Sequence, residues 1–160
     1  MEDFPWDAPV GRFMLAFGSI EHTTIALLGC LPDCRIPGNA PSLTLAQRIA
    51  ILKEVLPRHD GDEYKETLAG LNKVSKLTTH RNFIAHNSVW FDIHQDGDKL
   101  VITNHLISAR DRTKRLSLDQ VKALADEVHT AAHEFSLAAV EVMKNYIDDS
   151  EVDPDNAGIR

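Results

Sequence analysis

The fold is decided by residues 117–146, which read SLDQVKALADEVHTAAHEFSLAAVEVMKNY. Ser117 and Gln120 have the spacing of a capping box, in which two side chains bond the free backbone N–H groups at a helix start. Apolar residues then recur every three or four positions for about seven turns. They are Val121, Leu124, Val128, Ala131, Phe135, Ala139, Val142 and Tyr146. This pattern predicts one long helix whose apolar stripe packs against other helices.

Three earlier segments have the same period and predict three further helices. They cover about residues 10–31, 44–56 and 62–86. The second segment begins with another capping box, formed by Thr44 and Gln47. Together with the last helix, these segments predict a mainly helical bundle.

A β-hairpin is predicted at residues 89–105, between the third and the last helix. Two alternating apolar runs flank Asp96-Gly97, and Asp-Gly between such runs is a strong hairpin signal. A two-residue turn at these positions pairs Ile93 with Leu100. The pairing gives the hairpin one apolar face, which we expect to lie on the helices.

These elements predict an all-α protein, an up-down bundle of four to five helices with the hairpin inserted before the last long helix. Residues 1–147 form its single domain, as the length of the chain suggests. Residues 148–160 are acidic and contain Pro154 and Gly158, so we expect a disordered tail.

The composition indicates a soluble, cytoplasmic protein. Apolar residues make up 43% of the chain and charged residues 26%, which is typical of globular proteins. No apolar run approaches the roughly 18 residues of a membrane span, and the N-terminus is acidic where a secretory signal is basic. Cys30 and Cys34 are too few for a disulfide scaffold or a structural zinc site. We expect no metal, cofactor or membrane.

Arg81-Asn82-Phe83-Ile84-Ala85-His86 is the most informative stretch. Chance alone gives roughly 0.4 Arg–His pairs at this spacing in a chain of this composition, and roughly 0.02 when Asn must follow the Arg. The pattern resembles the HEPN superfamily, whose hallmark is Arg, a polar residue, three more residues and His, late in a helical bundle. Arg81, Asn82 and His86 match it residue for residue, whereas Asn87 stands where Gly often follows the His.

The resemblance implies a HEPN-like fold and a metal-independent endoribonuclease, commonly a homodimer with two motifs facing one cleft. Many members of the superfamily are toxins or defence proteins, often with a nucleotidyltransferase-like antitoxin as partner. Others have lost catalysis and serve as modules that bind a partner protein, a nucleotide or RNA. Both alternatives stay open at the level of the sequence.

The residue types suit RNA cleavage through the 2′-hydroxyl. His86 has a side chain that exchanges protons near neutral pH, Arg81 can neutralise the phosphoryl oxygens, and Asn82 can orient the ring or the substrate. Five positions correspond to about 140° around a helix, so Arg81 and His86 do not lie side by side. The spacing therefore favours a composite site in a dimer.

Several other side chains are candidates for supporting roles. Glu21 lies on or near the apolar face of the first helix, where a carboxylate needs a partner, and Arg81 is our candidate; otherwise Glu21 reaches water at the edge of the stripe. The net charge of −7 argues against indiscriminate binding of nucleic acid, yet residues 71–115 carry 8 basic and 4 acidic side chains. Candidate RNA contacts in this basic segment are Lys73, Lys76, His80, Arg110 and Arg112, with ordinary solvated positions as the alternative. His129 and His133 have the spacing of metal ligands but lack an evident third ligand.

Overall fold

A computed structural model describes residues 4–34 and 37–146 of the chain. The predicted tail at residues 148–160 lies outside this range. The elements, in chain order, are α1 (Asp7–Cys30), η1 (Pro37–Ser42), α2 (Leu45–Val55), η2 (Leu56–Arg58), α3 (Asp62–His86), β1 (Ser88–Asp96), β2 (Lys99–Ile107), β3 (Arg115–Leu116) and α4 (Leu118–Lys144). The two elements labelled η are short 3₁₀ helices.

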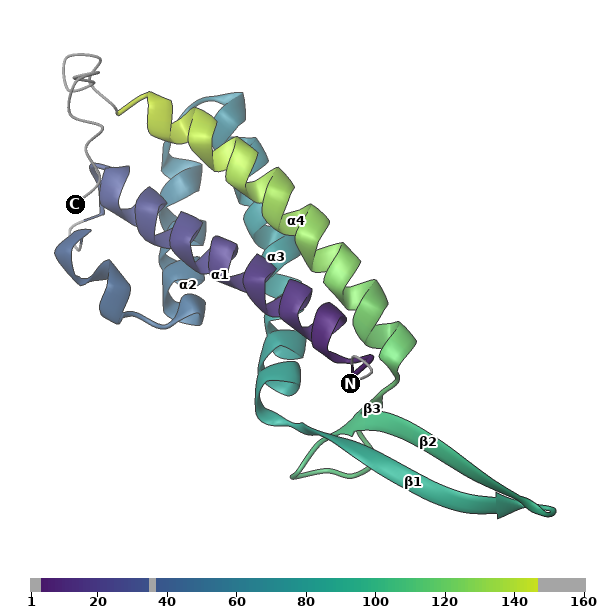
Figure 1. The fold of residues 1–160 in the computed structure, drawn as a ribbon. Helices are drawn as coiled ribbons and strands as arrows, with labels where there is room; N and C mark the ends of the chain where they lie inside the picture. The colour runs from purple at the N-terminus through teal and green to yellow at the C-terminus, as the bar shows by residue number, and fades with distance from the viewer. Residues whose placement is uncertain (1–3, 35–36, 147–160) are drawn as a thin grey trace, which may run out of the picture.

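The helices form a bundle in which α4 packs along both α1 and α3, with α2 on the other side of α1 and α3 (Figure 1). Phe13 and Phe17 of α1 and Phe135 of α4 are fully buried at its centre. Burial of each such side chain contributes about 1.5–3 kcal/mol to folding. The apolar stripes predicted for the first and last helices are therefore the faces that form the core.

The predicted capping boxes are both present. The side chain of Thr44 accepts a hydrogen bond from the backbone N–H of Gln47, and Ser117 does the same for Gln120, with the return bond made in each case. These boxes satisfy backbone groups that helix starts leave free. The predicted helix bounds agree with the structure to within three residues.

Helices α3 and α4 approach closely at Gly70. A Cβ atom at this position would lie 3.1 Å from the Cα of Phe135, which is tighter than ordinary packing distances. The absence of a side chain at Gly70 thus sets how near the two helices lie, and it keeps Phe135 in the core.

One helix in the described part of the chain, α1, is long and apolar enough to cross a membrane. Its 24 residues include an 18-residue window with a mean hydropathy of 1.3, so the expectation that no apolar run has this length was wrong. Length and composition of this kind also occur in core helices. The buried face of α1, which includes Phe13 and Ile20, packs inside the bundle.

The expected all-α class is wrong, because the chain also contains a three-stranded antiparallel sheet in the order β1-β2-β3. Strands β1 and β2 have nine residues each, and β3 adds two pairs at the base, Leu106 with Leu116 and Ile107 with Arg115. The short strand β3 follows the hairpin in a stretch where the sequence predicted no strand. The protein is therefore mainly helical, and its described residues form four α-helices with a small sheet between α3 and α4.

The hairpin turn differs from the predicted one by a shift of register. Asp96 pairs with Lys99, so the two turn residues are Gly97 and Asp98, and Ile93 pairs with Ile102 instead of Leu100. Gly97 has a φ of +58°, the left-handed conformation that a hairpin turn with Gly in its first position requires. The shift is two residues, so the same side chains share a face as predicted.

The apolar face of the hairpin does not lie on the helices, contrary to expectation, except near its base. Leu106 is buried against the bundle, whereas the distal part of the hairpin projects beyond the bundle end (Figure 1). The exposed apolar residues on this face are Phe91 (50%), Ile93 (63%), Leu100 (68%) and Ile102 (57%). We call these four side chains the hairpin apolar face.

Candidate functional site

Arg81 and Asn82 line a cavity of about 580 Å³ between α1, η1, α2 and α3. Glu21 contributes from α1, Arg48 from α2 and Thr78 from the turn of α3 before the motif. The cavity is open to solvent, and its partly apolar wall carries a few polar side chains that can orient a ligand. We call it the arginine cavity.

Arg81 is held in place by two neighbours. Its Nη2 donates to Oε1 of Glu21 at 3.2 Å, and its Nη1 donates to Oδ1 of Asn82 at 3.3 Å. The ion pair expected between Glu21 and Arg81 is thus present, and the two side chains are 35% and 31% exposed. The Nε of Arg81 is buried without a hydrogen-bond partner. A buried donor left in this state is costly, so this atom weakens the stabilisation that the ion pair gives.

Arg48 is a cavity residue that our reading of the sequence missed. It is only 4% exposed and donates to Oγ1 of Thr24 at 3.0 Å and to the backbone carbonyl of Leu43. No carboxylate of the described residues lies within ion-pair distance of its guanidinium. Two arginines and one glutamate therefore line the cavity, and the excess positive charge suits an anion. The signal was available, since Arg48 falls between Leu45 and Leu52 on the apolar side of its helix.

His86 lies in the last turn of α3, with its side chain exposed. It does not line the arginine cavity, in agreement with the helical spacing that separates it from Arg81. His80, one residue before Arg81, is half-buried and is likewise outside the cavity lining. One chain thus presents a cation and a proton-exchanging group on different sides of the same helix end.

Lys73 and Lys76 lie away from the arginine cavity. They line a separate hollow of about 520 Å³ between α3 and α4, which also contains Asp126, Glu127 and Glu134. Lys73 is paired with Glu134 at 2.7 Å. The acidic side chains on α4 reduce the positive potential that these lysines offer to a phosphate.

Arg110 and Arg112 are exposed in the loop that joins β2 to β3. The loop is fastened to the end of α3 by Asn87, whose Nδ2 donates to the Phe83 carbonyl at 2.6 Å and whose Oδ1 accepts the Ala109 N–H at 2.9 Å. Asn87 therefore ends α3: its own backbone is extended, and its side chain bonds a carbonyl of the last helical turn. This contact brings the basic loop to the residue that follows His86.

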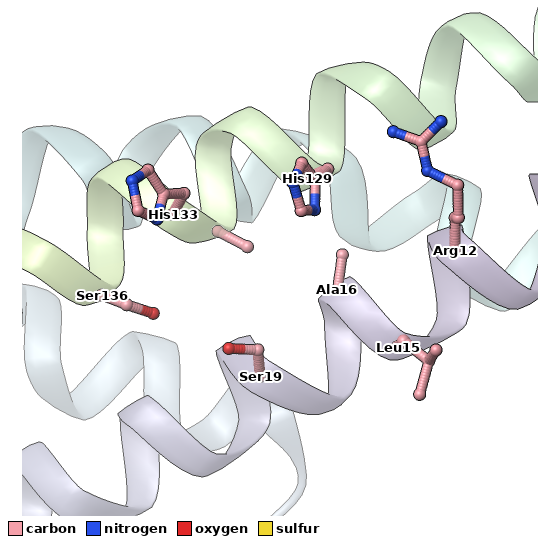
Figure 2. Close-up of a pocket in the computed structure, with 8 residues that line it drawn as sticks. Arg12, Leu15, Ala16, Ser19, His129, His133 and Ser136 are labelled. Atoms are coloured by element: carbon pink, nitrogen blue, oxygen red, sulfur yellow. The ribbon is translucent and has the colours of Figure 1, made fainter.

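His129 and His133 line a different cavity, of about 380 Å³, between α1 and α4. Figure 2 shows both rings on the α4 side, above Ala16 and Ser19 of α1. Within residues 4–34 and 37–146, no three His, Cys, Asp or Glu side chains cluster in a way that could hold a metal ion. Two histidines alone do not make a metal site in this cavity.

Comparisons of the chain with protein-family models, with curated proteins and with solved structures gave no match. The class that the fold and site define is a mainly helical protein with a projecting β-hairpin and an arginine-lined cavity next to an exposed histidine. Its function is therefore inferred from the motif and from the geometry of these residues.

Proposed function

We propose that this protein is a metal-independent endoribonuclease of the HEPN type, acting as a homodimer. One observation carries the proposal: Arg81 and Arg48 face a solvent-open cavity with a single carboxylate, and the helix that bears Arg81 also bears the exposed His86. A cavity with two arginines and one carboxylate has an excess positive charge that suits a phosphodiester, and an exposed imidazole is the kind of group that transfers protons in catalysis.

In the proposed reaction, the 2′-oxygen of one nucleotide attacks the adjacent phosphorus and the bond from phosphorus to the 5′-oxygen breaks. The 2′-hydroxyl loses its proton to a base, and the departing 5′-oxygen gains one from an acid. His86 serves as one of these two groups. Arg81 neutralises the charge that builds on the phosphoryl oxygens, Arg48 adds positive potential from the cavity wall, and Glu21 and Asn82 orient Arg81. The products are a 2′,3′-cyclic phosphate and a 5′-hydroxyl.

The proposal requires a second copy of the chain, because Arg81 and His86 of one chain are separated around the helix. The hairpin apolar face supplies a surface for it. A whole large apolar side chain has about 200 Å² of surface. The four residues of the hairpin apolar face and Phe4, which is 40% exposed, therefore leave roughly 500 Å² of apolar surface open to solvent per chain. Two such faces together reach about 1,000 Å², the lower limit of a specific interface.

The resemblance to HEPN proteins also supports a biological setting, which we propose as a toxin or defence role in the cytoplasm. A nucleotidyltransferase-like antitoxin is the partner that this setting suggests. The two thiols of the described chain, Cys30 and Cys34, are free, in keeping with a reducing compartment.

A second function is favoured by the Glu21–Arg81 ion pair. The pair neutralises much of the charge of Arg81 without a ligand, as a structural contact would. If Glu21 stays paired with Arg81 and leaves the guanidinium unavailable to a reacting phosphate, the protein is a non-catalytic HEPN-like module that binds a partner protein, a nucleotide or RNA. RNA cleavage separates the two functions.

The experiment uses purified protein and mixed-sequence RNA, with and without EDTA. We expect cleavage that EDTA does not stop, ends that carry a 2′,3′-cyclic phosphate, and no action on DNA. His86→Ala should lower the rate about 10²–10⁴-fold, because proton transfer is typically worth that much. His133→Ala, an exposed histidine on α4, is the matched control and should leave the rate unchanged. Cleavage that persists in His86→Ala would overturn the mechanism, and the absence of any cleavage would favour the binding module.

A further inference from the structure

Another cavity, of about 360 Å³, lies at the base of the hairpin. It is lined by residues from the start of β1, including Ser88, Trp90 and Asp92, and by Arg112 and Arg115 from the segment after β2. Trp90 is 49% exposed, which leaves much of a large aromatic ring open to solvent at a cavity wall. We call this the Trp90 cavity.

One arginine lies beside the ring of Trp90, and a second is held at the cavity by a carboxylate. The guanidinium carbon of Arg112 lies 5.7 Å from the ring centroid, within the range of a cation–π contact. Arg115 Nη1 lies 3.3 Å from Oδ2 of Asp92, and the same carboxylate oxygen lies 3.0 Å from Nε2 of His105. Asp92 thus orients Arg115, which lines the cavity.

The loop that carries Arg112 is folded rather than extended. Oγ of Ser108 accepts the backbone N–H groups of Arg110 and Asp111, each at 3.2 Å, and the Ser108 N–H donates to the Lys114 carbonyl. These bonds close the loop on itself and hold its arginines near Trp90. Such preorganisation lowers the ordering cost of binding a ligand.

The Trp90 cavity lies at the same end of α3 as His86. Ser88, which lines the cavity, is two residues beyond His86, and the side chain of Asn87 bonds the backbone of Ala109, another lining residue. A strand of nucleic acid whose phosphate is near His86 would therefore place a neighbouring nucleotide at this cavity.

We infer that the Trp90 cavity binds one nucleotide of single-stranded RNA, next to the bond that is cut. The base stacks on Trp90, where any base can bind because each has a π face, and Arg112 and Arg115 hold the flanking phosphate. The hydroxyl of Ser88 is placed to hydrogen-bond the base or the sugar. The cavity is within the usual size range for small ligands. The inference rests on the proposed function for the identity of the polymer, yet the binding step is separable from the chemistry.

Trp90 itself reports on the binding. The chain has two tryptophans, and the other, Trp6, is 1% exposed with its Nε1 bonded to Oδ1 of Asn104 at 2.9 Å. A base that stacks on Trp90 should quench the exposed tryptophan fluorescence and leave the emission of Trp6 unchanged. The probe is a short 2′-O-methyl oligouridine, which lacks the free hydroxyl that cleavage needs.

We expect Trp90→Ala to weaken binding of this probe about 5- to 100-fold, and Trp90→Phe to keep most of the affinity. Because both variants lack the reporting ring, their affinities are measured by the anisotropy of a fluorescently labelled probe. Arg112→Gln should lower the salt dependence of binding by about one phosphate contact. Leu137→Ala, a similarly exposed apolar residue on α4, is the control and should bind like the wild type. Equal affinity of Trp90→Ala and wild type, or no quenching at saturation, would overturn the inference.

The outcome does not depend on catalysis. Binding through Trp90 by a protein that cuts no RNA would sustain this inference and reject the ribonuclease. If the wild-type protein cleaves RNA and Trp90→Ala cleaves it with an unchanged KM, the ribonuclease is sustained and this inference is rejected.

Discussion

The carboxylate of Glu21 on α1 and the guanidinium of Arg81 on α3 form an ion pair with a distance of 3.2 Å between Oε1 and Nη2. Both side chains are about one third exposed, so the pair lies at the edge of the arginine cavity and not in the core. A pair with this exposure contributes about 1 kcal/mol or less to stability. Its main effect is on the direction in which Arg81 points.

The first prediction concerns Glu21→Gln. The amide can still accept a hydrogen bond but no longer neutralises Arg81, so we expect a Tm change of at most about 2–4 °C. Misplacement of the phosphate clamp should lower kcat for RNA cleavage about 10- to 100-fold. Glu141→Gln, which breaks the exposed pair with Lys144 on α4, is the matched control. A kcat unaltered by Glu21→Gln would show that Glu21 does not position Arg81.

The second prediction concerns the hairpin apolar face. Light scattering of the wild type at micromolar concentration should give about twice the chain mass of 17.8 kDa. Ile93→Asp puts a charge in the centre of the face and should give a monomer, because a buried unpaired carboxylate is costly. His94→Asp adds the same charge on the opposite face of β1 and should stay dimeric. A wild-type monomer at all concentrations would remove the composite site.

The third prediction concerns pH. The hydroxyls of Tyr64 and Tyr146 lie 2.8 Å apart, and burial together with this hydrogen bond raises the pKa of Tyr146 to about 12. The native state therefore keeps a proton that the unfolded chain loses near pH 10. The contribution to stability is complete below about pH 10 and is lost as the pH rises toward about 12.

An absorbance titration of tyrosinate checks this prediction. In Tyr64→Phe, Tyr146 is the remaining tyrosine, and its pKa should fall toward the usual value because the hydrogen bond is gone. A pKa of Tyr146 that is the same in the variant and the wild type would assign the shift to burial alone.

Local signals predicted the helices well. The capping boxes at Thr44 and Ser117 and the apolar period of α1 and α4 depend on residues a few positions apart, so they are readable in the sequence. The hairpin register was predicted wrongly because Asp96-Gly97 and Gly97-Asp98 are both acceptable turns by composition. The structure uses the second, with Gly97 in its first position.

Contacts between residues far apart in the sequence were harder to predict. The apolar alternation in β1 and β2 predicted an apolar face but not that most of it would be left uncovered, since that depends on where the hairpin leaves the bundle. Arg48 was missed although it falls on the apolar side of α2, because its partner Thr24 on α1 comes near it only in the fold. The pairing of Glu21 with Arg81 was predicted because a carboxylate beside an apolar stripe requires a partner.

The most direct test of the central claim is the activity of a mixed dimer. One subunit carries Arg81→Ala and the other His86→Ala, and the heterodimer is isolated with two different purification tags. If each site takes Arg81 from one subunit and His86 from the other, one of the two sites in the heterodimer is intact. We predict about half of the wild-type RNA cleavage rate, with each homodimeric variant reduced about 10²–10⁴-fold. A heterodimer as inactive as the two variants would contradict a site shared between subunits.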